Sequence, residues 1–408
     1  MNSNVSRPMP RADTGSRLLN WISDISFVLL QAERRFDHWL RPAFDATLRD
    51  PTARFVTWLM NRKRRDEGFK IAEERAIPNE EEYLNSIIES FTTQMKLLWK
   101  PGGFERGGNT KTHGIVRGEF IVHEDLPPQF RHGIYAKPQT FRCWVRFSGP
   151  GPYITPDIDD VGFMSISIKL LGVPGPKLID EEKFTVDLFG VSTPTFVTQD
   201  TKSNAHLQKW SVKNAQFFHF LNLREPHLAD MIMQGLWVKT QSSPFEAPYF
   251  SCVPYLLGEG QAMQYSVWPK TKRKMPIPRL PFRPPDDYLR AAMVKALSEG
   301  DVEFDFRIQL QTDPFLMPIE NNGVLWPEKI SPRVSVATLR LPRQKFDSPA
   351  QMEFAKRLSY NPWHTIAEHR PLGNQSRARK RMYLELSTLR HNMNNVPHFE
   401  PGGDEVFE

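Results

Sequence analysis

Short segments in which apolar and polar residues alternate recur through the middle and late parts of this 408-residue chain. In Thr140 to Ser148, the apolar residues Phe141, Cys143, Val145 and Phe147 fall on one face of a strand. Similar segments lie at 115–122, 161–171, 183–190, 262–268, 302–311 and 333–341. Because helices do not alternate regularly with these strands, they favour an antiparallel sheet closed into a barrel. We therefore predict an α+β fold in which helices surround an antiparallel β-barrel.

Other segments have the spacing of helices. A helix over 80–99 is expected after an Asn79-x-x-Glu82 signal. Further helices are predicted at 205–239, 285–299 and Gln375 to Asn392. The first two of these should pack outside the barrel.

The N-terminal part forms a separate helical extension, residues 1–75, before a main domain of residues 76–408. A polar segment to about residue 15 is expected to be disordered. Residues 16–65 then predict two or three amphipathic helices, interrupted near Pro42 and Pro51.

This extension carries the positive charge of the chain. Residues 1–65 contain 12 basic and 6 acidic residues and account for the whole net charge of +6. The rest of the chain is neutral, which argues against a nucleic-acid-binding surface. Trp21, Trp39 and Trp58 lie among the arginines of residues 16–65. Two interpretations follow: peripheral contact with an anionic membrane, or an arm that packs on the main domain or on another subunit of a homo-oligomer.

The chain has two cysteines, Cys143 and Cys252, so no disulfide framework holds the fold. No apolar run reaches the roughly 18–20 residues of a membrane span. Trp21 to Leu30, the best candidate, contains Asp24 and lacks the cleavage site of a signal peptide. We expect a cytoplasmic protein, with peripheral attachment to a membrane surface as the alternative.

The last predicted helix places one tyrosine between two arginines. At about 100° per residue, Arg379, Tyr383 and Arg390 fall on one stripe of the helix. A nearby guanidinium favours the phenolate form of tyrosine, and a phenolate is a known axial ligand of haem iron. Arg390 is placed to pair with a haem propionate. Taken alone, the same spacing also describes an ordinary surface pair.

Several blocks of sequence, in order, extend this interpretation. They resemble the catalase-related haem proteins, in particular the shorter bacterial and coral-type members. The blocks are Lys111–Gly114 with Arg117–Phe120, Val145–Ser148, Asp187–Gly190 with Thr193 and Pro194, and Asn361–His364 with His369–Gly373 and Arg377–Tyr383. The resemblance spans about residues 110–391 and implies a catalase-like barrel that binds haem b.

The resemblance also implies roles for individual residues. Tyr383 would ligate the iron, and Arg379 would stabilise its phenolate. His113 would be the distal acid and base, since an imidazole can accept a proton from one peroxide oxygen and deliver one to the other. Arg146 and Arg390 would contact the propionates. Ser148 would bond the distal histidine.

The chain departs from catalases on the distal side. Where catalases place an asparagine that orients the peroxide, this chain has Val191 and Ser192, and Ser192 offers only a hydroxyl. Losing such a donor typically costs a factor of about 10²–10³ in rate. Thr112 stands where catalases usually have valine and resembles the allene oxide synthases, in which its hydroxyl can bond the imidazole.

Two further departures concern the pocket. Thr110 replaces an arginine, so one propionate contact is lost or is supplied by Lys111. The sequence continues for only about 25 residues after Tyr383, from which we expect a pocket more open to bulky substrates. These features together predict a haem enzyme acting on organic or fatty-acid hydroperoxides, as a peroxidase or a hydroperoxide isomerase. The alternatives are a catalase that decomposes hydrogen peroxide and a degenerate haem-binding protein without efficient turnover.

Overall fold

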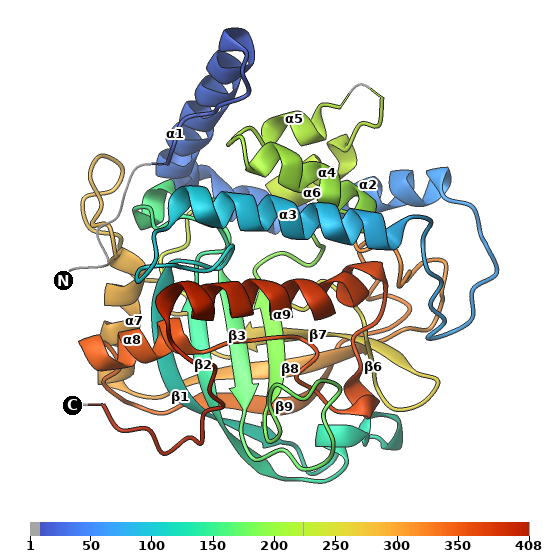
Figure 1. The fold of residues 1–408 in the computed structure, drawn as a ribbon. Helices are drawn as coiled ribbons and strands as arrows, with labels where there is room; N and C mark the ends of the chain where they lie inside the picture. Colours follow the sequence, from blue (N-terminus) through green and yellow to red (C-terminus); the bar gives the residue numbers. More distant parts are fainter. Residues whose placement is uncertain (1–8, 223, 408) are drawn as a thin grey trace.

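The computed structural model describes residues 9–222 and 224–407, which form a β-barrel with helices packed around it (Figure 1). The strands are β1 (Thr112–Val122), β2 (Thr140–Ser148), β3 (Ser165–Leu170), β4 (Val186–Val191), β5 (Tyr249–Phe250), β6 (Tyr255–Leu256), β7 (Ala262–Pro269), β8 (Val302–Leu310) and β9 (Val334–Leu341). The helices are α1 (Arg17–Thr47), α2 (Arg49–Lys63), α3 (Glu80–Leu98), α4 (Thr201–Ser211), α5 (Phe217–Phe220), α6 (Leu228–Gly235), α7 (Tyr288–Glu299), α8 (Pro349–Arg357) and α9 (Asn374–Asn394).

The barrel closes through antiparallel pairing alone. Its strands follow the order β5-β4-β3-β2-β1-β9-β8-β7, and β5 pairs with β7 to complete a ring of eight. The short strand β6 pairs with β7 beside the ring. A closed ring removes the exposed sheet edges that would otherwise invite pairing with other chains. The predicted α+β fold with an antiparallel barrel is confirmed.

Both faces of β2 are buried, but against different partners. Phe141, Cys143, Val145 and Phe147 point into the interior core, as the alternation predicted. The opposite face, which includes Trp144, meets helices and the C-terminal segment: its indole lies 5.0 Å from the ring of Phe354 on α8 and 5.8 Å from that of Phe407. The outer face of β1–β4 is therefore an internal layer that elements outside the barrel cover.

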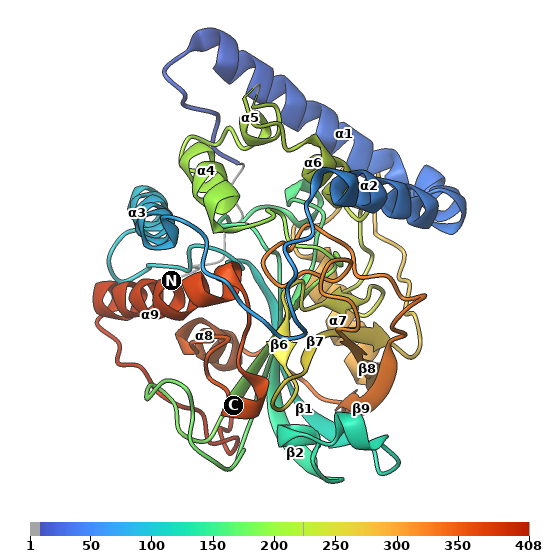
Figure 2. The ribbon, with the colours of Figure 1, turned by 90° about the vertical axis from the view of Figure 1, so that its right-hand side faces the viewer.

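Helices α3, α4 and α9 lie together on one side of the barrel (Figures 1 and 2). Leu84, Ile87 and Ile88 of α3 pack against Ala378 and Met382 of α9. Asn79 precedes α3 as predicted, but its φ of 60° is left-handed and its side chain makes no capping hydrogen bond. Helix α8 was not predicted, because its nine residues are too few for a clear periodic pattern.

The N-terminal helices differ from the prediction at Pro42. Helix α1 continues through this residue, and the break comes at Leu48. A proline inside a helix loses one hydrogen bond. Contacts on both sides compensate, since Arg41 donates to the carbonyl oxygen of Gly235 at 2.8 Å and Asp45 pairs with Lys239 at 2.8 Å. Pro51 lies in the first turn of α2, where its missing N–H costs nothing.

The expected disorder near the N-terminus falls largely outside the described residues, which begin at residue 9. Residues 9–15 contact the main domain, where the backbone N–H of Asp13 donates to the carbonyl oxygen of Lys213 at 2.8 Å.

Gly373 fixes the start of α9. Its φ is +86°, and a Cβ there would lie 2.5 Å from the carbonyl oxygen of Ile319. We expect Gly373→Ala to lower the free energy of unfolding by about 2 kcal/mol or more, from backbone strain and overpacking. Gly235→Ala is the matched control, because a Cβ at that exposed helix end meets no atom within 4 Å. Denaturant unfolding of both variants tests this, and equal stability of the two would contradict it.

Candidate functional site

One row of side chains crosses the outer face of the barrel where β1 begins. The register places Ser148 of β2 opposite Thr112 of β1 and also opposite Ser165 of β3, which pairs with Val191 of β4. Directly opposed residues on one face have Cβ atoms about 4.5–5.5 Å apart. We call Thr112, Ser148 and Ser165 the hydroxyl row. It ends at Val191 on one side and beside His113 on the other.

His113 is a buried base without hydrogen-bonding partners. It sits at a bulge in the pairing of β1 with β2, and its side chain is 1% exposed. Neither ring nitrogen is hydrogen-bonded among the described residues. Arg290 of α7 holds the backbone by donating to the carbonyl oxygens of His113 at 3.1 Å and Thr112 at 2.9 Å. Burial, with the positive charges of Lys111 and Arg290, lowers the pKa of His113 well below its usual value, so the ring is neutral.

A carboxyl group from a distant segment faces this imidazole. The Oδ1 atom of Asp157 lies 3.5 Å from Nδ1 of His113 and 2.7 Å from Nζ of Lys111. Its Oδ2 atom accepts from the backbone N–H of Leu289 at 2.8 Å. Burial raises the pKa of Asp157 to about 6, although Lys111 opposes this. The sequence offered no sign of Asp157, which lies 44 residues after His113.

The hydrogen bonds expected at His113 are absent from the described residues. The Oγ1 atom of Thr112 accepts from Nε of Arg146 at 3.1 Å and from its Nη2 at 2.6 Å, so the hydroxyl faces the arginine and not the imidazole. The Oγ atom of Ser148 is buried and has no partner. The strand register explains both, since Arg146 and Ser148 lie on the same face of β2 as Thr112 on β1.

Ser192 does not take the place of the missing asparagine. Its hydroxyl oxygen accepts from the backbone N–H of Met164 at 2.9 Å, so the side chain is turned to the neighbouring strand connection. Ser165, which pairs with Val191, instead has a buried hydroxyl without a partner. The donor nearest the expected position is therefore Ser165, a residue that only the strand pairing identifies.

Tyr383 lies on α9, at the edge of the cluster that joins α3, α4 and α9. Its ring meets that of Phe189, on the outer face of β4, edge to face at 5.9 Å. The phenol makes no hydrogen bond with any other described residue. One turn earlier, Arg379 lies over the ring of Phe196 at 5.0 Å, and its Nη1 atom is buried without a partner.

Three guanidinium groups gather between the barrel and α9; we call Arg106, Arg146 and Arg390 the guanidinium cluster. Arg106 and Arg390 both donate to the carbonyl oxygen of Leu358. Burial and then Arg106 lower the pKa of Arg146 to about 9 and that of Arg390 well below its usual value. Glu105 opposes both shifts and Glu181 opposes that of Arg390, but these two carboxylates do not balance three guanidiniums. The cluster is suited to an anionic ligand.

No sequence pattern pointed to Arg106. It lies seven residues before His113, outside the block that resembles the distal site. Lys111, expected to replace the arginine lost at Thr110, is instead held by Asp157 and by Asp287, at 2.7 and 3.1 Å. The third positive charge therefore comes from Arg106 and not from Lys111.

These groups provide a test of whether the residues fit a haem. Buried polar atoms without partners are uncommon and cost about 1–3 kcal/mol each. Six such atoms belong to the residues described above: both ring nitrogens of His113, Oγ of Ser148 and Ser165, and one guanidinium nitrogen each of Arg106 and Arg379. A haem needs cations for its two propionates, an axial ligand and a polar distal side. The guanidinium cluster, Tyr383 and the hydroxyl row with His113 match these requirements.

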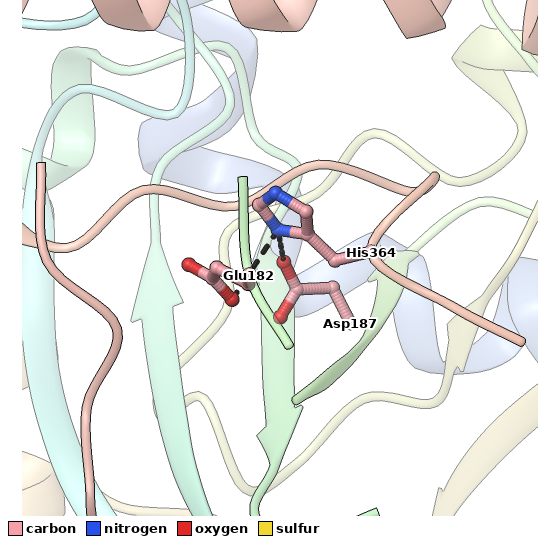
Figure 3. Close-up of side chains that lie close together, drawn as sticks. All are labelled: Glu182, Asp187 and His364. Atoms are coloured by element: carbon pink, nitrogen blue, oxygen red, sulfur yellow. Dashed lines mark hydrogen bonds and ion pairs between the residues drawn. The ribbon is translucent and has the colours of Figure 1, made fainter. Parts of the chain in front are cut away.

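A second group of charged side chains is joined by ion pairs (Figure 3). Nδ1 of His364 lies 2.8 Å from Asp187 and 3.4 Å from Glu182, and its Nε2 lies 2.9 Å from Glu181. Their spacing would suit a metal ion. However, Nζ of Lys169 already pairs with Asp187, at 2.8 Å, and with Glu182. This charge network joins β3 and β4 to the segment that precedes α9.

A surface cavity of about 490 Å³ lies elsewhere, between residues 68–75, residues 256–260 and Arg370. None of the residues discussed above lines it. Its size alone does not make it the functional site.

Neither a family model nor a curated protein matches this chain. Its fold does match solved structures of catalases. The similar structures include a fungal catalase (TM-score 0.56, 18% identity, 84% of this chain and 69% of that chain), catalase A from Saccharomyces cerevisiae (0.55, 15%, 85% and 72%) and a bacterial catalase (0.52, 14%, 81% and 64%). The chain therefore has a catalase-like fold. At such identities the likeness concerns the fold alone.

The charge network predicts a loss of stability at alkaline pH. Although burial disfavours the charged ring, hydrogen bonds with Asp187 and Glu181 raise the pKa of His364 to about 9, from 6.5. The contribution of the charged His364 ring to the free energy of unfolding is thus complete below pH 6.5. It disappears as the pH rises through 9, a change of at most about 3 kcal/mol. The difference in unfolding free energy between wild type and His364→Gln should shrink between pH 7 and about 10.

His219→Gln is the control, since burial lowers the pKa of His219 to about 3 and its ring stays neutral throughout this range. The difference between this variant and wild type should not change with pH. If the difference in unfolding free energy between wild type and His364→Gln also stayed constant with pH, the proposed charge on His364 would be refuted.

Proposed function

We propose that this protein is a haem-dependent enzyme acting on organic or fatty-acid hydroperoxides, as a peroxidase or a hydroperoxide isomerase. The catalase-like fold is the starting point. The observation that carries the proposal is a pattern on the covered face of the barrel. There the ring nitrogens of His113 and the hydroxyls of Ser148 and Ser165 have no hydrogen-bond partners, and they adjoin three buried guanidiniums and the helix of Tyr383.

Each part of a haem has residues that would hold it. Tyr383 would ligate the iron, and Arg379 would favour its phenolate form. Arg106, Arg146 and Arg390 would hold the propionates. The bound iron would supply the redox chemistry needed to break a peroxide O–O bond.

His113 would move the proton. Its lowered pKa makes it neutral at physiological pH, so it can accept a proton from a hydroperoxide oxygen and later return it. Because Nδ1 faces Asp157, the Nε2 atom is the one left to face a substrate. Burial of the ring excludes water, which strengthens its interactions with the substrate.

The distal side favours an organic substrate. Val191 presents an apolar surface next to the row, where an amide would orient a small peroxide. Ser165 keeps one hydroxyl there for the hydroperoxide group. An alkyl chain against Val191 and a peroxide end against Ser165 and His113 would suit an organic hydroperoxide better than hydrogen peroxide.

Decomposition of hydrogen peroxide is the second candidate, favoured because the solved structures matched above are catalases. The missing amide at Val191 favours a third, a haem-binding protein with little turnover.

We predict that Tyr383→Phe abolishes or greatly weakens the Soret absorption of the purified protein, because the variant lacks the iron ligand. Tyr83→Phe is the control, since Tyr83 lies in the same cluster between α3 and α9 and has no assigned role. Circular dichroism checks that both variants fold. A Soret band of unchanged position and strength in Tyr383→Phe would rule out the ligand assignment.

The substrate is tested by comparing consumption of a fatty-acid hydroperoxide with oxygen release from hydrogen peroxide. We expect the first to be faster in wild type. Val191→Asn should raise oxygen release about tenfold or more by restoring an amide donor. Val191→Ala, which changes size without adding a donor, should not. Faster oxygen release in wild type would favour a catalase, and no consumption of either peroxide would favour the third candidate.

A further inference from the structure

Helix α1 exposes its apolar face and buries its polar one. At about 100° per residue, twelve apolar positions fall within an arc of about 120°, which contains no charged residue of the helix. These positions are Leu18, Trp21, Ile22, Ile25, Val28, Leu29, Ala32, Phe36, Trp39, Leu40, Ala43 and Ala46. Eight of the large side chains among them are 38% to 75% exposed. A helix of a globular protein normally has the opposite orientation.

Specific polar contacts hold the helix in this orientation. The Oγ atom of Ser23 donates to the carbonyl oxygen of Asn214 at 3.1 Å, and Asp37 accepts from the backbone N–H of Thr240 at 2.6 Å. Arg41 donates to the carbonyl oxygen of Gly235 at 2.8 Å. Turning the apolar face inward would break these bonds and leave their backbone partners in the main domain against apolar side chains.

Helix α2 continues the exposed surface. Phe55 and Trp58 stack with ring centroids 5.8 Å apart, and Arg62 lies 5.0 Å over the Trp58 ring. Both rings are about half exposed. Figure 2 shows α1 and α2 along the outer edge of the molecule, with α5 and α6 beside them. We call the exposed apolar residues of α1 and α2 the apolar face.

Basic side chains flank this face. Arg17, Arg54, Arg62, Lys63 and Arg65 are exposed, and none pairs with a carboxylate within residues 9–222 and 224–407. Each basic side chain near an anionic bilayer contributes about 1 kcal/mol of attraction. Trp and Phe are also the aromatic residues that membrane interfaces favour. The surface thus matches an anionic bilayer in charge and in apolar character.

We propose that α1 and α2 form a docking surface for an anionic lipid bilayer, with α1 lying flat in the interface. Among the described residues, no helix is long and apolar enough to cross a membrane. A second copy of this chain fits less well, because it would bring the same basic residues together.

The docking surface adjoins the candidate site. Arg34, on the buried side of α1, donates to the carbonyl oxygen of Asp157 at 3.5 Å, and Asp157 faces His113. Docking would hold the site beside membrane lipids, a source of fatty-acid hydroperoxides. This link rests on the proposed function, whereas the docking surface itself does not.

Sedimentation of the full chain with lipid vesicles tests the proposal without haem or peroxide. Wild type should bind vesicles of phosphatidylcholine with phosphatidylglycerol at least tenfold more tightly than vesicles of phosphatidylcholine alone, and salt should weaken this binding. The combined variant Trp21→Gln, Trp39→Gln and Leu40→Gln should lose at least tenfold. Phe282→Gln, at an exposed apolar residue outside the extension, should bind like wild type.

Sedimentation velocity of the same proteins tests the alternative, in which a second copy of this chain covers the apolar face. The substituted residues are exposed, so the combined variant should fold. Equal vesicle binding by wild type and the combined variant would overturn the proposal. A wild-type oligomer that becomes a monomer in the combined variant, without vesicle binding by either, would also overturn it and make the face a subunit interface.

Discussion

The pairing of β5 with β7 is the constraint on which the rest of the structure depends. It closes the eight strands, so their interior can be filled by an apolar core while the outer face of β1–β4 becomes a second, internal surface. Helix α8 packs on β1, and Tyr383 of α9 meets Phe189 of β4, so these helices cover that surface. The hydroxyl row, the guanidinium cluster and Tyr383 all lie in the layer created in this way.

The two groups of buried charges in this layer differ in one physical respect. Around His364, three carboxylates pair with Lys169 and with a protonated imidazole, so groups of opposite charge meet within the chain. Around His113, the ring nitrogens and the hydroxyls of Ser148 and Ser165 have no hydrogen-bond partners. The three guanidiniums nearby outnumber the carboxylates of Glu105 and Glu181. The first group holds elements together. The second keeps a cost in unsatisfied polar atoms that a bound anionic group would offset.

Polar contacts also decide the orientation of helix α1 at the surface. Its polar contacts with the main domain keep apolar side chains facing outward, although hydrophobicity alone would turn them inward. Contiguous exposed apolar surfaces of this kind mark sites of interaction. The helix therefore contacts the segment that holds Asp157 on one side and exposes its apolar side chains on the other.

The sequence alone determined the barrel, the helix of Tyr383 and the order of the blocks, because these depend on local period and spacing. It predicted a break at Pro42 wrongly, since contacts of Arg41 and Asp45 with distant residues decide that helix. Only the tertiary structure brought Arg106 to Arg146 and Arg390, and Ser165 to the hydroxyl row. It also decided which face of α1 is exposed. These features depend on strand register and on contacts between residues far apart in sequence, which no local pattern encodes.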